Sequence, residues 1–360
     1  MINIFYGIKK LLCLFLCLYG WQLATAQQRI VVEAGNAESL LEAISDANRL
    51  HDAPQQEWLY IVIPSGTYDL GERVLTTLTA NHVALVGEGM DSTIIRNQPP
   101  VEQEGIATTA TLRITGTDNY LQDLTLLNGM REGAGRAVCL QDCGTRTICR
   151  RVRMLSHQDT YYSDNETGQM YFLECEIHGT VDFICGAGDV YFDRCRIVTE
   201  RRSQGAKGRC VIAAPRTSKT AWGYVFDHCT IENHESAFVY ARGWRITPRC
   251  VWLHTTLLSP EKLRPSRFEP KGMRTIDSYF KEYGTCDGSG QNVMPASNLL
   301  TLTLKDEQRT IETVLSKRQA RRYTLKNVFP EWNVQKVLKR IRTTNDTIDT
   351  KKNSTTNDSN

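Results

Sequence analysis

Two aspartates, Asp159 and Asp182, have the surroundings expected of carboxylates that do chemistry. Each lies in an otherwise weakly charged segment, and Asp182 sits between Val181 and Phe183 rather than in a solvated run of charges. Two neighbouring carboxylates with different surroundings can divide into an ionised nucleophile and a protonated acid. Arg242 can hold one of the pair ionised through a bidentate hydrogen bond. These residue types indicate a pair of carboxylates that share nucleophilic and acid–base work.

Two further side chains fit the same chemistry. Gln158 carries amide protons suited to stabilising an oxyanion, and Trp244 offers a flat face for a sugar ring. The residue types alone leave a purely structural alternative open. In that alternative Asp159 and Asp182 cap turns, and Arg242 neutralises one of them.

Repeated short strands are the elements that must position these residues. Three segments share one theme: 171–177 (YFLECEI), 191–197 (YFDRCRI) and 225–231 (VFDHCTI). Irregular strand repeats of roughly 20 residues are typical of a parallel β-helix, in which residues one coil apart lie side by side. Asp159 and Asp182 are 23 residues apart, close to one coil, so we expect them to face the same groove. A β-sandwich of hairpins is the alternative, and it calls for more two-residue turns between tightly spaced strands.

The fold class predicted from these patterns is all-β, with one β-helix over residues 27–342. A short helix with Leu40, Leu41, Ile44 and Ala47 on one face should precede the coils. After the coils we expect the following elements: a closing strand at 299–304, a polar helix at 306–318 and a short amphipathic helix at 334–341. Residues 343–360 are almost all Thr, Asn, Asp, Ser or Lys, so we expect a disordered tail.

The first 26 residues have the layout of a secretory signal peptide. Lys9 and Lys10 precede a short apolar run, and Ala24-Thr25-Ala26 supplies the small residues of a cleavage site before Gln27. The run is too short to span a bilayer comfortably, which disfavours a permanent membrane anchor. The sequence therefore predicts a secreted or periplasmic protein.

Charge excludes one broad class of partner. The chain has 43 Lys and Arg against 40 Asp and Glu, and removing the predicted signal peptide leaves 41 against 40. A formal charge of +1 provides no bulk field for nucleic acid, although a local basic groove for an acidic polymer stays possible. We therefore expect no nucleic-acid partner. Separately, we expect a monomer.

Three blocks of sequence together resemble the signature motifs of the pectin methylesterase (pectinesterase) family. They are residues 158–160 (Gln-Asp-Thr), 179–183 (Gly-Thr-Val-Asp-Phe) and 242–244 (Arg-Gly-Trp). Blocks at 135–138, 211–217, 282–284 with 288–290, and 323–332 agree in order. The resemblance covers roughly residues 30–332, and its specificity comes from the order and spacing of the blocks rather than from any one tripeptide.

The resemblance implies a right-handed parallel β-helix that removes methyl esters from homogalacturonan, with water as co-substrate and no metal or organic cofactor. By position, Asp182 would attack the C6 carbonyl, and Asp159 would protonate methanol and then activate water. Gln158 would bind the oxyanion, and Arg242 would keep Asp182 ionised. The sugar subsites would be lined by Trp244, Tyr162, Phe183 and, more weakly placed, Met273.

Among the positions that depart from the family pattern, two bear most directly on the chemistry. Arg136 stands where the family usually has a second glutamine of the oxyanion hole, and Cys185 stands where it often has an aromatic subsite residue. Arg136 can still donate to an oxyanion, so it joins the predicted catalytic residues. Its charge would also favour ionisation of both aspartates, which would weaken Asp159 as an acid.

Cys175 and Cys195 occupy matching places in neighbouring repeats. Stacked one coil apart, their Cα atoms would be about 4.8 Å apart, within the range of a disulfide. The sequence therefore predicts a bridge between them, with two stacked buried thiols as the alternative. The pairing of the other eight cysteines of the mature chain stays open.

Two rival functions remain. One is another pectin-degrading β-helix enzyme, but the chain has neither the calcium-binding aspartate cluster of a lyase nor the Asp-Asp pair of a polygalacturonase. The other is a catalytically impaired pectin-binding protein, which Arg136 favours.

Overall fold

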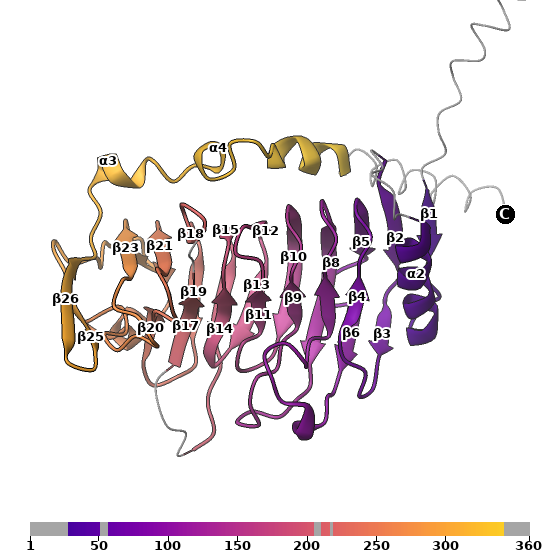
Figure 1. Cartoon of the computed structure of the whole chain (residues 1–360), viewed down its shortest axis with the longest axis horizontal. Helices are drawn as coiled ribbons and strands as arrows, with labels where there is room; N and C mark the ends of the chain where they lie inside the picture. The colour runs from indigo at the N-terminus through magenta and orange to yellow at the C-terminus, as the bar shows by residue number, and fades with distance from the viewer. Residues whose placement is uncertain (1–27, 51–56, 205–209, 217–218, 342–360) are drawn as a thin grey trace, which may run out of the picture.

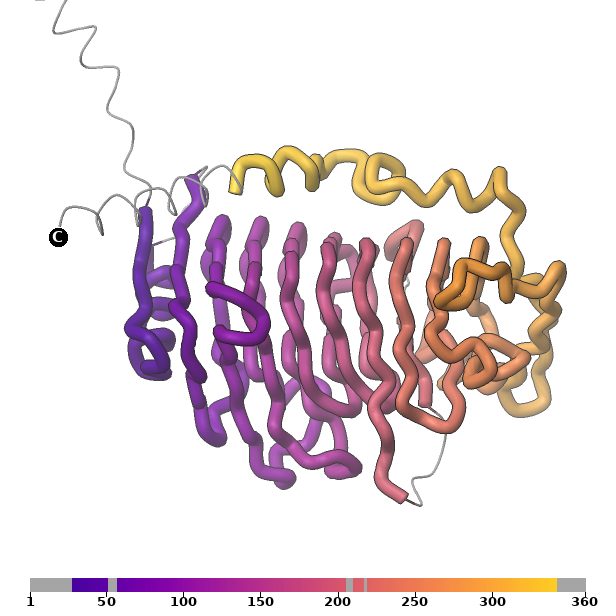
Figure 2. The backbone as a smooth tube through the Cα atoms, turned by 180° about the vertical axis from the view of Figure 1, so that it is seen from behind, coloured from indigo at the N-terminus to yellow at the C-terminus, as the bar shows by residue number. Residues whose placement is uncertain are grey.

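The chain winds through stacked coils, and each strand pairs in parallel with the equivalent strand of the next coil (Figure 1). The computed structural model describes residues 28–50, 57–204, 210–216 and 219–341. The predicted signal peptide and polar tail lie outside the described residues. The tube in Figure 2 shows the coils side by side along the long axis. The predicted parallel β-helix is confirmed.

The longest sheet has two rows of strands that meet at a corner. The first row contains β1 (Arg29–Val31), β2 (Leu59–Ile63), β5 (Val83–Gly87), the first parts of β8 (Tyr120–Asn128) and β10 (Thr147–Leu155), β12 (Gln169–Leu173), β15 (Asp189–Asp193), β18 (Tyr224–Asp227), β21 (Arg249–Leu253) and β23 (Tyr279–Tyr283). The second row contains β3 (Gly66–Asp69), β6 (Thr93–Asn97), the second parts of β8 and β10, β13 (Glu176–Gly179), β16 (Arg196–Thr199), β19 (Thr230–Asn233), β22 (Thr256–Leu257) and β24 (Cys286–Asp287).

A separate seven-stranded parallel sheet forms the third face. Its strands are β4 (Thr76–Leu78), β7 (Leu112–Ile114), β9 (Leu140–Asp142), β11 (Tyr161–Ser163), β14 (Val181–Gly186), β17 (Cys210–Pro215) and β20 (Phe238–Ala241). Short helical turns occur in two of the loops, η1 (Val101–Gln103) and η2 (Pro260–Lys262).

One left-handed residue per coil makes the corner between the first two rows. We call these residues the corner ladder: Asp123, Arg151, Glu174, Arg194, His228 and His254, with φ between 47° and 54°. Backbone in this region turns sharply, and Asp and His are among the non-glycine residues that enter it most readily. The strand register places each ladder residue directly beside its counterpart in the next coil.

The interior is filled by stacks of like side chains, as the repeats predict. Phe192 stacks on Phe226 with ring centroids 4.4 Å apart, and Phe226 stacks on Trp252 at 3.8 Å. All three rings are fully buried. Because inward positions recur at the same place in each repeat, parallel pairing turns a repeated aromatic into a continuous column.

The predicted disulfide is wrong in this structure. Cys175 and Cys195 do lie side by side one coil apart, since Glu176 pairs with Arg196 in register. Both are free thiols, as are all ten cysteines of the described residues. Parallel in-register strands point the two Cα–Cβ bonds the same way, whereas a disulfide needs the side chains to turn toward each other. Cys175 Sγ instead donates to the carbonyl of Cys149 at 3.3 Å.

Elements at both ends close the coils. Helix α2 (Ala37–Leu50) buries Leu40, Ile44 and Ala47 against the first coil, as predicted; Leu41 is only partly buried there, and Ala43 joins the buried face. The closing strand is confirmed as β25 (Leu299–Leu304). The polar helix expected at 306–318 is wrong, because β26 (Glu307–Glu312) pairs antiparallel with β25. Lys305, at φ 52°, makes the tight turn that returns the chain.

The last part of the chain runs back along the first row (Figures 1 and 2). It contains α3 (Lys317–Ala320), α4 (Leu325–Val328) and a helical stretch at 334–341, which confirms the predicted amphipathic helix. Phe329 and Trp332 from this segment join Tyr171 and Tyr191 of the first row in one apolar cluster. No helix among the described residues is long and apolar enough to cross a membrane.

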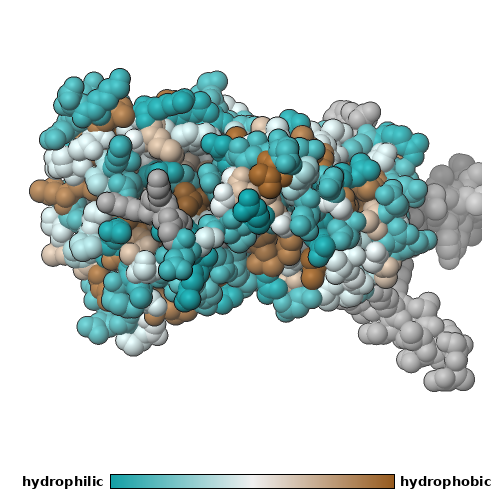
Figure 3. Space-filling view, turned by 90° about the horizontal axis from the view of Figure 1, so that it is seen from below, coloured by the Kyte–Doolittle hydropathy of each residue, from teal (hydrophilic) through white to brown (hydrophobic). Residues whose placement is uncertain are grey.

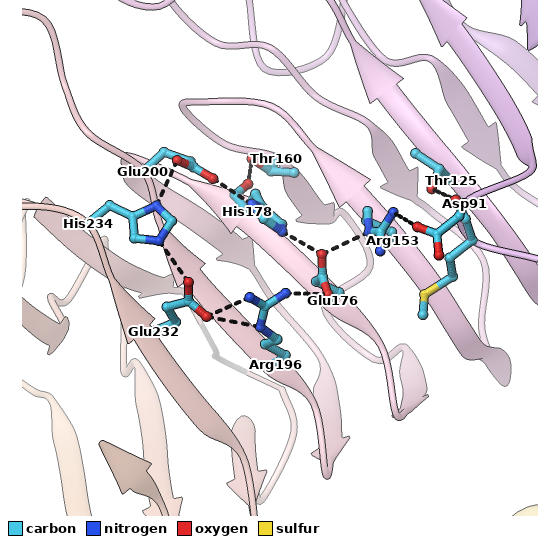
Figure 4. A network of polar contacts seen from close by, with 11 residues as sticks. Asp91, Thr125, Arg153, Thr160, Glu176, His178, Arg196, Glu200, Glu232 and His234 are labelled. Atoms are coloured by element: carbon cyan, nitrogen blue, oxygen red, sulfur yellow. Dashed lines mark hydrogen bonds and ion pairs between the residues drawn. The ribbon is translucent and has the colours of Figure 1, made fainter. Parts of the chain in front are cut away.

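Charged side chains along the second row form a continuous network (Figure 4). Glu176 is its centre: it receives hydrogen bonds from Arg153 at 2.8 Å and Arg196 at 2.7 Å, and it lies 2.8 Å from His178. Together His178, Arg196 and Arg153 lower the pKa of Glu176 to about 2. His178 and His234 each lie between two carboxylates, with Glu200 common to both.

Replacing Glu176 by Gln should make folding stability depend less on pH. A carboxyl whose folded pKa is depressed stabilises the fold above its unfolded value near 4.5, and that contribution is lost as the pH falls toward 2. We expect E176Q to lose roughly 2–3 kcal/mol at pH 7, with the difference closing between pH 4.5 and 2. Urea unfolding at several pH values measures this.

Asp91 gives a matched control, because it binds Arg153 in the same network but its side chain is 88% exposed. Asp91→Asn should change stability by less than about 1 kcal/mol at any pH. A pH-independent loss in E176Q, or an equal loss in D91N, would contradict the assignment.

Candidate active site

Asp159 and Asp182 lie side by side on the third face, one coil apart. Isolated parallel bridges align Arg136 with Gln158 and Gln158 with Val181. The following residues, Asp159 and Asp182, therefore occupy equivalent places in neighbouring coils. The prediction that 23 residues make one coil is confirmed here. Both side chains are nearly buried, at 4% and 5% exposure.

A bulge in β14 explains how a buried strand presents Asp182. Val181 pairs with Val211 and Ile184 with Ala213, so two residues of β14 oppose one residue of β17. The extra residue shifts the inward and outward alternation, and Asp182 takes a left-handed φ of 51°. Asp159 has the same feature, with φ 60°. Both carboxylates therefore belong to residues with a left-handed backbone, a conformation that recurs at functional sites.

The same bulge corrects one predicted subsite residue. Phe183 points into the hydrophobic core and is fully buried, so it does not contact the groove. Its Cβ also sits where a side chain on Gly179 would have to be, only 2.1 Å from the position of such a Cβ. Glycine at 179 thus lets the chain pack closely beneath the bulge.

The two carboxylates open into a cleft of about 280 Å³. Its lining combines charged and apolar side chains: Ile106, Arg136, Gln158, Asp159, Asp182, Cys185, Ala214, Arg242, Trp244 and Met273. Most of the residues predicted for the site are therefore brought together. Seen from below, the surface is mostly hydrophilic, with apolar side chains gathered near the middle of its length (Figure 3).

Tyr162 supports the cleft wall rather than forming it. It is 4% exposed, and its ring centroid is 6.3 Å from that of Trp244. Its hydroxyl donates to Asp164 at 2.5 Å. Tyr162 therefore positions Trp244 from behind.

Arg242 binds Asp182 with both arms of its guanidinium. Its Nε donates to Oδ1 at 2.8 Å, and Nη2 donates to Oδ2. Burial raises the pKa of Asp182, whereas the charge and hydrogen bonds of Arg242 oppose that rise. Of the two carboxyls, Asp182 is therefore the one whose ionised form the bound arginine favours.

The pKa of Asp159 is also raised, without a bound guanidinium to oppose the rise. Burial, followed by repulsion from Asp182, raises the pKa of Asp159 well above its usual range. Arg136 opposes this rise, but only from 3.9 Å. The Arg136 guanidinium is instead bound by Glu104, whose Oε1 accepts from Nη1 at 2.7 Å. Because Glu104 offsets its charge, Arg136 does not override the burial that keeps Asp159 protonated.

A sequence model of the pectinesterase family matches residues 29–328. The chain belongs to the pectinesterase family. It is 25% identical over 302 residues to "Probable pectinesterase/pectinesterase inhibitor 6" of Arabidopsis thaliana; the match covers 81% of this chain and 53% of that relative. The chain thus spans about half the length of this plant relative. It is 28% identical to "Probable pectinesterase A" of Aspergillus oryzae, over 71% of this chain and 77% of that relative.

Solved pectin methylesterases share the fold. The carrot enzyme superposes with a TM-score of 0.69 at 20% identity, covering 88% of this chain and 98% of that chain. The enzyme PemA from Erwinia chrysanthemi gives 0.66 at 22% identity, covering 86% and 99%. The right-handed parallel β-helix predicted from the sequence is confirmed by these neighbours.

Residue types alone do not predict two residues of this candidate site. Glu104 comes from the loop after η1, and nothing in its polar surroundings marks it as the partner of Arg136. Arg216 lies 5.4 Å over the Trp244 ring and donates to Asp164 at 2.7 Å. Its only sequence signal is its place in the 211–217 block.

Removing Arg242 should leave Asp182 as an unpaired buried charge. We expect Arg242→Gln to lower the free energy of unfolding at pH 7 by about 3 kcal/mol. Removing the guanidinium leaves the Asp182 carboxylate buried without a counter-charge, so its desolvation is no longer compensated. The loss should shrink as the pH falls and Asp182 takes up a proton. Urea unfolding at pH 7 and pH 4 measures both effects.

The double variant D182N/R242Q is the control. Because it has no buried charge left at this position, it should recover stability relative to R242Q at pH 7. A double variant as unstable as R242Q, or the same loss at both pH values, would contradict the pairing.

Proposed function

We propose that this protein hydrolyses the C6 methyl esters of homogalacturonan, releasing methanol and leaving de-esterified pectate. One observation carries the proposal: two carboxyls one coil apart share a cleft, and their surroundings differ. Arg242 binds Asp182 and favours its ionised form, while burial and repulsion raise the pKa of Asp159 well above its usual range. A nucleophile and an acid side by side are what ester cleavage in two steps requires.

In the first step Asp182 attacks the ester carbonyl carbon. A bond forms between a carboxylate oxygen of Asp182 and that carbon, and the bond to the methoxy oxygen breaks. Asp159 gives its proton to the departing methoxide, so methanol leaves neutral. Gln158 and Arg136, both on the cleft wall, are placed to donate to the oxyanion that forms in between.

In the second step water hydrolyses the bond between Asp182 and the acyl carbon. Asp159, now ionised, takes a proton from water, and the resulting hydroxide attacks the acyl carbon. The bond to Asp182 breaks, and Asp182 recovers its carboxylate. Asp159 is again protonated, so the pair returns to its starting state without a further cofactor.

The apolar side of the cleft suits a sugar ring. Trp244 and Met273 line it, and Arg216 backs the Trp244 ring. Cys185 lines the cleft with a short side chain and leaves the subsite roomy. A pectin methylesterase of the same fold has been solved in complex with a hexasaccharide, which supports an oligosaccharide substrate for the shared architecture.

We further propose that the protein acts outside the cytoplasm as a monomer. The basic pair Lys9-Lys10, the apolar run and Ala24-Thr25-Ala26 support export with cleavage before Gln27. Pectin is an extracellular polymer, so export and substrate agree.

The central test is methanol release from highly methylated pectin. Asp182→Asn should lower kcat by roughly 10³-fold or more, because the amide is no nucleophile. Asp142→Asn is a matched control: Asp142 also lies on the third face, one coil from the site, but it is fully buried in the interior. Burial raises the pKa of Asp142 to about 7, so an amide imitates its neutral form.

D142N should therefore keep most of the activity. Absence of methanol release by folded wild-type protein at any pH would favour a pectin-binding protein instead. Equal activity in D182N and wild type would exclude Asp182 as the nucleophile.

Glu104 should set the alkaline limit of activity. Its charge raises the pKa of Asp159 and offsets Arg136. In Glu104→Gln the Arg136 charge acts on Asp159 uncompensated, so the pKa of Asp159 falls. Since the acid must be protonated, the alkaline limb of kcat/KM should move to lower pH.

Glu102→Gln serves as the control, because Glu102 is exposed in the same loop. Its pH profile should match that of the wild type. An unchanged profile in E104Q, or a limb moved to higher pH, would contradict the role given to Glu104.

A further inference from the structure

The last two residues of the corner ladder are both histidines, unlike the alternating acids and bases before them. Earlier in the ladder acids and bases alternate: Arg151 binds Asp123 at 2.6 Å, and Arg194 lies 3.7 Å from Glu174. His228 and His254 follow, and their rings stack directly with centroids 4.6 Å apart and planes 26° apart. Two imidazoles therefore stand together where the pattern elsewhere pairs opposite charges.

One carboxylate oxygen lies close to both imidazole rings. Asp227 Oδ1 lies 2.9 Å from Nδ1 of His228 and 2.9 Å from Nδ1 of His254. The other oxygen, Oδ2, accepts a hydrogen bond from the Tyr191 hydroxyl at 2.8 Å. Tyr191 thus fixes the carboxylate so that Oδ1 faces the two rings, as outer partners commonly do for metal-binding carboxylates.

The backbone holds these side chains rigidly while leaving them accessible. His228 and His254 both have left-handed φ, at 54° and 48°, set by the corner. Tyr283 packs edge-on against His254, with centroids 5.7 Å apart. The two imidazole side chains are still 60% and 42% exposed, so an ion can reach them from solvent.

Other histidines of the described chain are arranged differently. In the network of Figure 4, His178 has carboxylates at both ring nitrogens, Glu200 at 2.6 Å and Glu176 at 2.8 Å. His234 is likewise held between Glu200 and Glu232. Both nitrogens of each ring are used, and arginines complete the charge balance there. That network is a salt-bridge array rather than a site with converging donors.

We propose that Asp227, His228 and His254 form a binding site for a divalent late transition-metal ion such as Zn²⁺, Ni²⁺ or Cu²⁺. Their three donor atoms lie within 4.8 Å of one another. Imidazole nitrogen and carboxylate oxygen suit these ions, whereas Mg²⁺ and Ca²⁺ prefer oxygen alone. Tetrahedral zinc bonds of about 2.0–2.1 Å separate two donors by about 3.3–3.4 Å. Oδ1 and each ring nitrogen, now 2.9 Å apart, would therefore move apart by about half an ångström to bind the ion.

Metal binding requires a particular protonation state of the two imidazoles. It needs an unprotonated Nδ1 on each ring, and a neutral imidazole meets this need in the tautomer whose proton is on Nε2. Nearby Arg194 is bound to Asp193 at 3.0 Å, so its charge is offset locally. The site lies on the corner between the first two rows, and the inference does not depend on the proposed esterase activity.

Calorimetric titration of the untagged full chain with ZnCl₂, in a non-chelating buffer, tests the site. We expect one ion per chain, with binding at least tenfold weaker in His228→Gln and in His254→Gln. Tyr191→Phe should weaken binding by about 10-fold or more, as loss of an outer partner does. Cu²⁺ bound to the wild type should show nitrogen couplings from two imidazoles in its electron paramagnetic resonance spectrum.

His234→Gln is the matched control, because it removes a partly exposed imidazole that has carboxylate partners but lies outside the site. It should bind Zn²⁺ like the wild type. Melting temperatures without metal check that every variant folds. Wild-type binding no tighter than that of an H228Q/H254Q double variant, or equal loss in H234Q, would overturn the proposal, and so would equal affinity for Mg²⁺.

Discussion

Every side chain of a parallel β-helix must tolerate the side chain one coil away. Coils repeat at the strand spacing of about 4.8 Å, so equivalent residues meet in register along the axis. Like apolar groups gain from this arrangement, whereas like charges at that distance repel and must be neutralised or offset. The stacking of Asp159 over Asp182 is the functional case. Burial on the third face removes the water that would screen them, so the two carboxyls cannot both ionise at low cost.

The same constraint orders the rest of the molecule. Inside the coils it is met by stacked rings, such as Phe226 on Trp252. Along the second row it is met by alternating acids and bases centred on Glu176. In the cleft it is met by one arginine that binds only one of the two aspartates. Arg242 favours the ionised form of Asp182, and Glu104 offsets the charge of Arg136, which would otherwise favour ionisation of Asp159 as well.

Sequence reasoning captured what depends on repetition. The matching strands at 171–177 and 191–197 predicted the coils, and the 23-residue spacing placed both aspartates in one cleft. The prediction of Phe183 as a subsite residue was wrong, because one extra residue in β14 shifts the alternation of inward and outward side chains and turns Phe183 into the core. Strand periodicity in the sequence does not indicate such an inserted residue. The predicted disulfide between Cys175 and Cys195 was wrong for a different reason: the two residues are neighbours, but side chains on parallel strands do not face each other. Partners far apart in sequence, such as Glu104 and Arg136, carry no local signal.

The unequal protonation of the two aspartates is the claim on which the account depends, and carboxyl titration tests it directly. The protein labelled with ¹³C at aspartate carboxyls would be followed by NMR across pH, with Asp159→Asn and Asp182→Asn used for assignment. Asp159 should titrate well above the usual aspartate range and above Asp182. The pKa of Asp159 should also fall in D182N, where the repelling charge is gone. Titration of Asp159 in the ordinary range, or below Asp182, would contradict that claim.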